Sequence, residues 1–123
     1  MSLNVIMDQK IFMDACGQST EGFNKNQYDL YVDLIREEFT ELEDAVLYDN
    51  KVEVIDAVLD IITVCVGLLH SSGCDAQGAW DEVVRSNMSK VDPSTGKVIR
   101  RDDGKILKPS SYSPPDLLPF MIS

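Results

Sequence analysis

The chain has 123 residues, of which 44% are hydrophobic, so its length and composition favour a globular domain and exclude wholesale disorder. Its 21 acidic and 11 basic residues give a net charge of −10, which argues against non-specific binding to a nucleic acid polymer. The longest apolar run, residues 61–69, is much shorter than the roughly 20 residues of a membrane span, so no membrane partner is expected.

Four helical stretches are predicted in the first 90 residues. The second is rich in Glu and Leu and free of Gly and Pro, and Asp75 is placed to cap the fourth. A loop rich in Ser, Asn and Gly separates the first two helices at residues 18–27. The predicted helices cover, in chain order, residues 5–17, 29–48, 52–70 and about 76–89.

From Val91 onward the sequence becomes irregular. Residues 92–96 and 102–104 are turn sequences, and apolar pairs at 98–99 and 106–107 flank the second turn. This arrangement predicts a small hairpin in the tail.

The whole pattern predicts one helical domain over residues 1–123, with a helical core over about 5–90 and an irregular tail over about 91–123. The three cysteines lack Cys-x-x-Cys spacing, which is typical of reduced thiols. Because the first residues also lack the basic start of a secretory signal, we expect a cytoplasmic protein.

Carboxylates interrupt the apolar stripe of the second predicted helix. At about 100° per residue, Glu38 falls inside the stripe, Glu41 lies on its edge and Glu37 lies beside Glu41. A carboxylate in an apolar stripe is costly unless it is paired or binds a metal.

The third predicted helix has the same anomaly. It is apolar on almost every side, so we expect it to be deeply buried, yet Glu53, Asp56 and Asp60 share one narrow strip. If this strip meets the acids of the second helix, repulsion raises the pKa values of the carboxyl groups unless a cation lies between them. The alternative is that these acids point to solvent.

The candidate ligands are all oxygens, which favours Mg²⁺ or Mn²⁺. Zinc would require Cys or His, and Gly67, three residues before the only histidine, His70, excludes the usual Glu-x-x-His di-iron motif. Mg²⁺ usually takes further ligands from water and substrate phosphates. Residues 85–108 carry seven basic and three acidic residues and could contact such phosphates.

Two groups of residues carry a family resemblance. Glu37-Glu38-Phe39-Thr40-Glu41, followed by Glu53-Val54-Ile55-Asp56, resembles the Glu-Glu-x-x-Glu … Glu-x-x-Asp signature of the MazG-like all-α nucleoside triphosphate pyrophosphohydrolases. That superfamily includes phosphoribosyl-ATP pyrophosphohydrolases and dimeric dUTPases. Arg85-Ser86-Asn87-Met88-Ser89-Lys90 and Tyr112-Ser113-Pro114-Pro115-Asp116 are similar to the end of small phage and bacterial members. The likeness covers about residues 28–118.

The resemblance implies an all-α, four-helix-type bundle that is completed by a second copy, as a homodimer or a dimer of dimers. It implies hydrolysis of a nucleoside triphosphate to a monophosphate and pyrophosphate with Mg²⁺, which Mn²⁺ can replace. By motif position, Glu38 and Glu41 would bind the metal, and Glu37 would activate water or bind a further metal. Asn87 and Lys90 would contact phosphate.

The second half of the metal motif departs from the pattern, because the residue three before Asp60 is Ala57 rather than Glu. A literal match selects Glu53 and Asp56, whereas members with an Asp-Ala-x-x-Asp variant favour Asp56 and Asp60. We therefore expect Asp56 and Asp60 to complete the metal site, with Glu53 as a further candidate.

Two other functions remain open at this point. The chain could be a non-catalytic helical module that binds a nucleotide or a cation, or an inactive homologue that retains nucleotide binding. The sequence does not specify the base or the sugar of the nucleotide.

Overall fold

The computed structural model describes residues 2–122, which divide into two units. The N-terminal unit contains residues 2–76 together with 121–122, and the C-terminal unit contains residues 77–120. The helical assignment and the small hairpin are confirmed, whereas one domain over residues 1–123 stays a prediction.

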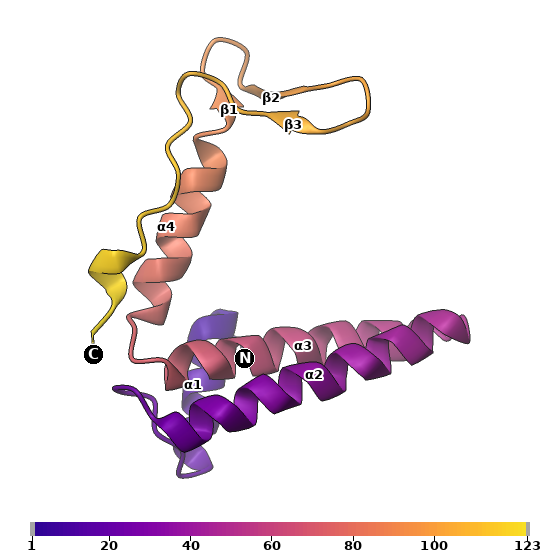
Figure 1. Cartoon of the computed structure of the whole chain (residues 1–123), viewed down its shortest axis with the longest axis vertical. Helices are drawn as coiled ribbons and strands as arrows, with labels where there is room; N and C mark the ends of the chain where they lie inside the picture. The colour runs from indigo at the N-terminus through magenta and orange to yellow at the C-terminus, as the bar shows by residue number, and fades with distance from the viewer. Residues whose placement is uncertain (1, 123) are drawn as a thin grey trace. The chain divides into compact units, whose positions relative to one another are not determined.

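Three helices build the N-terminal unit: α1 (Val5–Ala15), α2 (Lys25–Leu47) and α3 (Lys51–Ser71). An asparagine caps each of them, because its side-chain oxygen accepts a hydrogen bond from the backbone N–H three residues later. These caps are Asn4, Asn24 and Asn50. The cap at Asn24 explains why α2 begins four residues before its predicted start. Figure 1 shows α2 and α3 side by side, with α1 crossing them.

The core of this unit forms where α2 passes close to α3. The Tyr31 ring, from α2, is buried with Met13 and Val64. Its close approach requires a glycine on α3, since a Cβ at Gly67 would lie only 2.2 Å from Cε1 of Tyr31. The Tyr31 hydroxyl donates a hydrogen bond to Oε1 of Gln18, at 2.6 Å. One residue without a side chain therefore sets the spacing of the two long helices.

Buried hydrogen bonds attach the C-terminal end of α3 to its neighbours. His70 Nε2 donates to the carbonyl oxygen of Ile6 in α1, at 2.8 Å. Gln27 Nε2, in the first turn of α2, donates to Ser71 Oγ, also at 2.8 Å. His70 thus has the helix-end position that the sequence predicts, and it holds α1 against α3.

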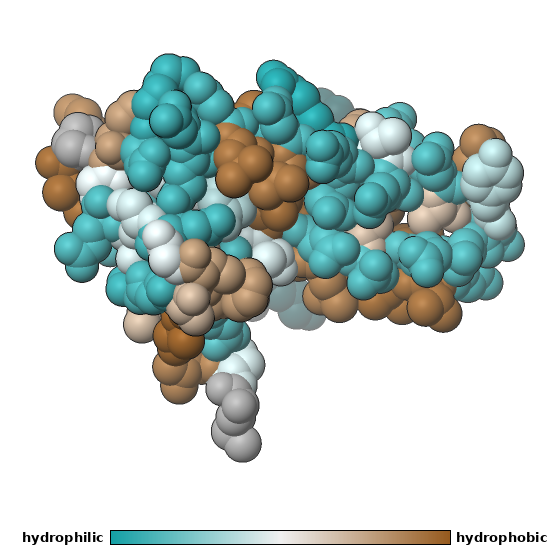
Figure 2. Space-filling view, turned by 90° about the horizontal axis from the view of Figure 1, so that it is seen from below, coloured by the Kyte–Doolittle hydropathy of each residue, from teal (hydrophilic) through white to brown (hydrophobic). Residues whose placement is uncertain are grey.

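The prediction that α3 is deeply buried is wrong for one face of the helix. Large apolar side chains at helical spacing remain exposed because α1 and α2 cover only part of its circumference. Their exposed fractions are 75% for Val52, 62% for Ile55, 57% for Leu59 and 41% for Ile62. Figure 2 shows hydrophobic side chains exposed among hydrophilic ones along the α2–α3 hairpin.

The C-terminal unit contains nearly all of α4 (Ala76–Met88) and a three-stranded antiparallel sheet in the order β1-β2-β3. The strands are β1 (Val91–Asp92), β2 (Lys97–Arg100) and β3 (Ile106–Leu107), followed by the 3₁₀ helix η1 (Leu118–Phe120). The predicted hairpin is β2–β3, in which Ile99 pairs with Leu107. Strand β1 is absent from the expected elements because Asp92, one of its two residues, belongs to the turn sequence of residues 92–96.

The chain then returns to the N-terminal unit. Met121 forms an isolated antiparallel bridge with Cys74, and the backbone N–H of Ile122 donates to the carbonyl oxygen of Gly73, at 2.8 Å. No helix within residues 2–122 combines the length and hydrophobicity that crossing a membrane requires.

We predict that Gly67→Ala destabilises the N-terminal unit, although alanine is the better helix former. The added methyl group would overlap the Tyr31 ring, and overpacking of a core costs about 1–3 kcal/mol, against a propensity gain of about 1 kcal/mol. Urea unfolding should show a lower free energy of unfolding for Gly67→Ala than for the wild type. Thr63→Ala, at an exposed position of α3, is the control and should change stability by less than about 0.5 kcal/mol. An unchanged or higher stability of Gly67→Ala would contradict the packing argument.

Candidate functional site

Three carboxyl groups meet between α2 and α3. Glu38 and Glu41 lie one turn apart on α2, and Asp60 comes from α3. One carboxylate oxygen of each residue lies within 4.8 Å of the other two. Glu41 is exposed, whereas Glu38 and Asp60 are half-buried. None of the three forms a salt bridge with a residue in the described range 2–122, so their charges are not neutralised by a basic side chain.

Glu38 occupies the least favourable position for a negative charge. Its Oε2 atom is shielded from solvent and has no hydrogen-bond partner among the described residues. Burial is the largest cause that raises the pKa of Glu38 to about 7, and the neighbouring Glu41 carboxyl adds to it, followed by the charges of Asp60 and Asp56. A positive ion at this point would offset the free-energy cost of burying the negative charge of Glu38 and would reduce the repulsion from the neighbouring carboxylates.

The other predicted acids lie around this group of three. Asp56 is exposed one turn before Asp60 on α3, and its charge contributes to the raised pKa of Glu38. Glu37 is exposed on α2 and forms no hydrogen bond or salt bridge with residues 2–122. Glu53 is exposed in the first turn of α3. The structure therefore brings Asp60, rather than Glu53, to the two glutamates of α2.

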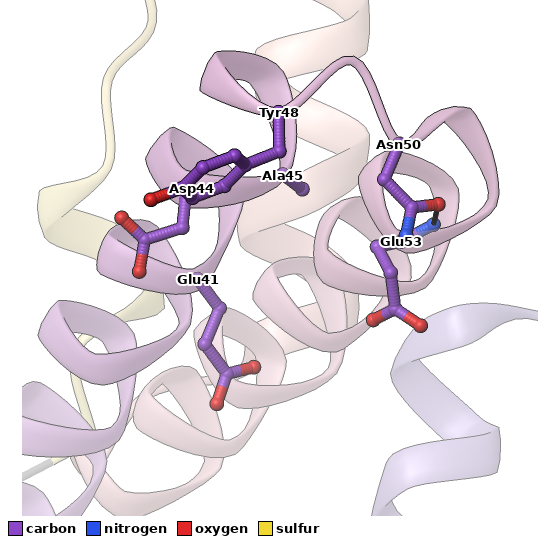
Figure 3. A pocket seen from close by; sticks show the side chains of 6 residues that line it. All are labelled: Glu41, Asp44, Ala45, Tyr48, Asn50 and Glu53. Carbon is purple, nitrogen blue, oxygen red and sulfur yellow. Dashed lines mark hydrogen bonds between the residues drawn. The ribbon is translucent and has the colours of Figure 1, made fainter.

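A cavity of about 380 Å³ adjoins the cluster and shares Glu41 with it. Figure 3 shows Glu41 and Glu53 with their carboxyl groups on the same side, and the ring of Tyr48 beside Asp44. The cavity is lined by Glu41, Asp44, Ala45, Tyr48, Asn50 and Glu53. Its volume is in the range of small-molecule sites.

Only Glu41 and Glu53 of these six residues are candidates from the sequence; the polar side chains of Asp44 and Tyr48 were not singled out. A signal was present, because they follow Glu41 by three and seven residues and so share its face of the helix.

The predicted phosphate contacts lie in the C-terminal unit. Asn87 is in the last turn of α4, and Lys90 follows the helix. Lys90 Nζ donates a hydrogen bond to Oδ1 of Asn87, at 3.3 Å, so the two side chains are neighbours. Their contact with a phosphate stays a prediction.

The donor set of the cluster fits a hard divalent cation. It offers three carboxylate oxygens without a nitrogen or sulfur atom, which suits Mg²⁺ or Mn²⁺ better than Zn²⁺. The solvent-shielded Oε2 of Glu38 is the strongest single indication, because a buried carboxylate oxygen without a partner is costly to keep.

The raised pKa of Glu38 predicts that the metal-free protein loses stability as the pH rises. The carboxyl titrates near its ordinary value of 4.5 in the unfolded chain and at about 7 in the folded chain. The folded state therefore binds this proton more tightly, and its contribution to the free energy of unfolding falls between these two pH values. Urea unfolding at pH 5 and pH 8, with a chelator, should show a smaller decrease for Glu38→Gln than for the wild type. Equal decreases in the two proteins would contradict the assignment.

Comparison with known proteins gives one family. The family described as phosphoribosyl-ATP pyrophosphohydrolase matches residues 7–87, which include α2, α3 and the acidic cluster between them. No curated protein matches the chain. The match spans more than half of the chain and covers every candidate metal ligand. The chain therefore belongs to the phosphoribosyl-ATP pyrophosphohydrolase family and is a nucleotide pyrophosphohydrolase, a hydrolase that acts on an acid anhydride.

Proposed function

We propose that the chain hydrolyses a nucleoside triphosphate to a nucleoside monophosphate and pyrophosphate, with Mg²⁺ bound by Glu38, Glu41 and Asp60. The observation that carries the proposal is the convergence of these three carboxyl groups within 4.8 Å, inside the segment that matches the family. Asp56, one turn from Asp60, is proposed as a fourth ligand, and Glu53 as a more distant one.

The proposed reaction is the attack of water on a phosphorus atom with loss of pyrophosphate. When bound, Mg²⁺, which Mn²⁺ can replace, neutralises charge on the phosphate oxygens. Glu37 is exposed and adjacent to Glu38, and it holds no other partner among residues 2–122. We assign it to orient the water and to accept its proton. Asn87 and Lys90 supply an amide and an ammonium donor for the phosphates.

The substrate class follows from charge. The acidic cluster needs a cation, and Mg²⁺ with open coordination positions binds phosphate oxygens readily. Nucleoside triphosphates are the first substrates to test, and phosphoribosyl-ATP, which the family description names, is the next. The cavity beside Glu41 is large enough to hold part of such a ligand.

We also propose that the working form is a homodimer or a dimer of dimers. The uncovered stripe of α3 supports this, since Val52, Ile55, Leu59 and Ile62 recur at helical spacing and remain exposed. An exposed apolar stripe of this length is typical of an interaction site rather than of a monomer surface. A second copy of the chain offers the same stripe and can cover it by a two-fold contact.

The hydrolysis is tested by measuring pyrophosphate release from ribo- and deoxynucleoside triphosphates and from phosphoribosyl-ATP, with Mg²⁺ or Mn²⁺ and then with excess chelator. We expect metal-dependent release and a loss of at least about 100-fold in kcat for Glu38→Gln, because the variant removes a negative ligand. Glu43→Gln, an exposed acid of α2 outside the cluster, is the matched control and should retain wild-type turnover. No release by the wild type with any substrate would instead favour a non-catalytic nucleotide- or cation-binding module.

The dimer is tested by Leu59→Glu, which places a charge in the exposed stripe of α3. Burying an unpaired charge in a contact is costly, so sedimentation equilibrium should show a shift from dimer to monomer. Leu30→Glu changes an exposed leucine of α2 outside that stripe and should leave the mass unchanged. A monomeric wild type at micromolar concentration would refute the proposal, as would equal dissociation of both variants.

A further inference from the structure

Two lysines of the C-terminal unit gather around one aromatic ring. Lys108 Nζ lies 4.8 Å from the centroid of the Tyr112 ring, and Lys90 Nζ lies 5.9 Å from the same centroid. Each distance is within the range of a cation–π interaction, which contributes about 0.5–1 kcal/mol at an exposed site. The Tyr112 ring is therefore a contact that the two lysines share.

Hydrogen bonds on both sides of Tyr112 fix the ring against the end of α4. Ser111 Oγ donates to the carbonyl oxygen of Ser89, at 3.1 Å. The backbone N–H of Ser113 donates to Ser89 Oγ, and its carbonyl oxygen accepts from Ser86 Oγ, both at 2.9 Å. A ring placed between two anchored residues is pre-organised, which reduces the entropy lost when the lysines bind a ligand.

The charges of the two lysines are not compensated. Lys90 bonds only to the neutral Asn87 amide, and neither lysine forms a salt bridge with a residue in the range 2–122. Two neighbouring arginines differ, because Arg85 pairs with Glu82 and Arg101 pairs with Asp103. In a chain with a net charge of −10, two lysines that share one aromatic ring and lack an acidic partner among residues 2–122 are suited to binding an anion.

We infer that Lys108 joins Lys90 and Asn87 in one phosphate-binding cluster and that Tyr112 is its positioning residue. The cluster presents two ammonium groups and one amide group, which suits the several oxygens of a pyrophosphate or triphosphate chain. The inference rests on the proposed function, in which Asn87 and Lys90 contact the phosphates. It adds Lys108 as a direct contact and assigns Tyr112 a role through the two lysines.

The test is a calorimetric titration of the full-length chain with inorganic pyrophosphate, at low salt and with a chelator. Lys108→Gln should raise the Kd at least about tenfold, the factor expected for a hydrogen bond to a charged group. Lys51→Gln is the matched control, because it removes the same charge from an exposed lysine of α3 outside residues 85–108, and its Kd should stay within about twofold of the wild type. Tyr112→Leu should weaken binding as Lys108→Gln does, whereas Tyr112→Phe keeps the ring and should restore it.

Pyrophosphate-release kinetics give the second measurement. Lys108→Gln and Tyr112→Leu should raise KM for the triphosphate with little change in kcat, as expected for a lost phosphate contact. Equal Kd values for Lys108→Gln and Lys51→Gln, or no binding of pyrophosphate by the wild type, would overturn the cluster. A wild type that binds pyrophosphate in the expected pattern but releases none from any nucleotide would refute the proposed hydrolysis and leave the cluster supported.

Discussion

Repulsion among three carboxyl groups is the cost that the packing of α2 against α3 has to offset. Glu38, Glu41 and Asp60 converge without a basic partner in the described range. Because one oxygen of Glu38 is shielded from solvent, water screens the repulsion among the three carboxylates less effectively. Tyr31 and Gly67 supply the close contact that keeps the helices together despite this repulsion. Since a bound cation would remove the cost, affinity for the cation and stability of the fold are linked quantities in this protein.

Acidic and basic residues gather in different segments of the chain. Residues 29–60 hold 11 acidic and 2 basic residues, whereas residues 85–108 hold 7 basic and 3 acidic ones. A cation attracts the first segment and phosphate oxygens attract the second. Each segment therefore suits one part of the proposed metal–phosphate ligand.

Local sequence signals predicted the helices well, because each helix has its own periodicity and an asparagine or a turn at its end. The predicted start of α2, at residue 29, is four residues later than the observed start at Lys25. Asn24 lies in a Ser- and Asn-rich stretch that predicts a loop, although its side chain caps the helix. The acids that interrupt the apolar stripes of the two helices pointed to the cluster from the sequence alone. The preference for Asp60 over Glu53 needed the family resemblance, because helical periodicity does not show how far α3 slides along α2. The Tyr31–Gly67 contact between these helices joins residues 36 positions apart. The sequence also could not predict that one apolar face of α3 is exposed. An apolar helix face has the same sequence pattern whether the chain itself or another molecule covers it.

The return of the chain to Cys74 gives the C-terminal unit the topology of an insertion. Residues 77–120 leave the N-terminal unit after Ala76 and re-enter it at Met121, whose bridge to Cys74 holds the two crossing points together. Segments whose two ends lie close together can be lengthened, shortened or exchanged with little disturbance of the host unit. The C-terminal unit could therefore change in length or sequence with little disturbance of the helices that carry the acidic cluster. A single backbone cleavage within residues 77–120 would leave both of the resulting pieces covalently attached to the N-terminal unit.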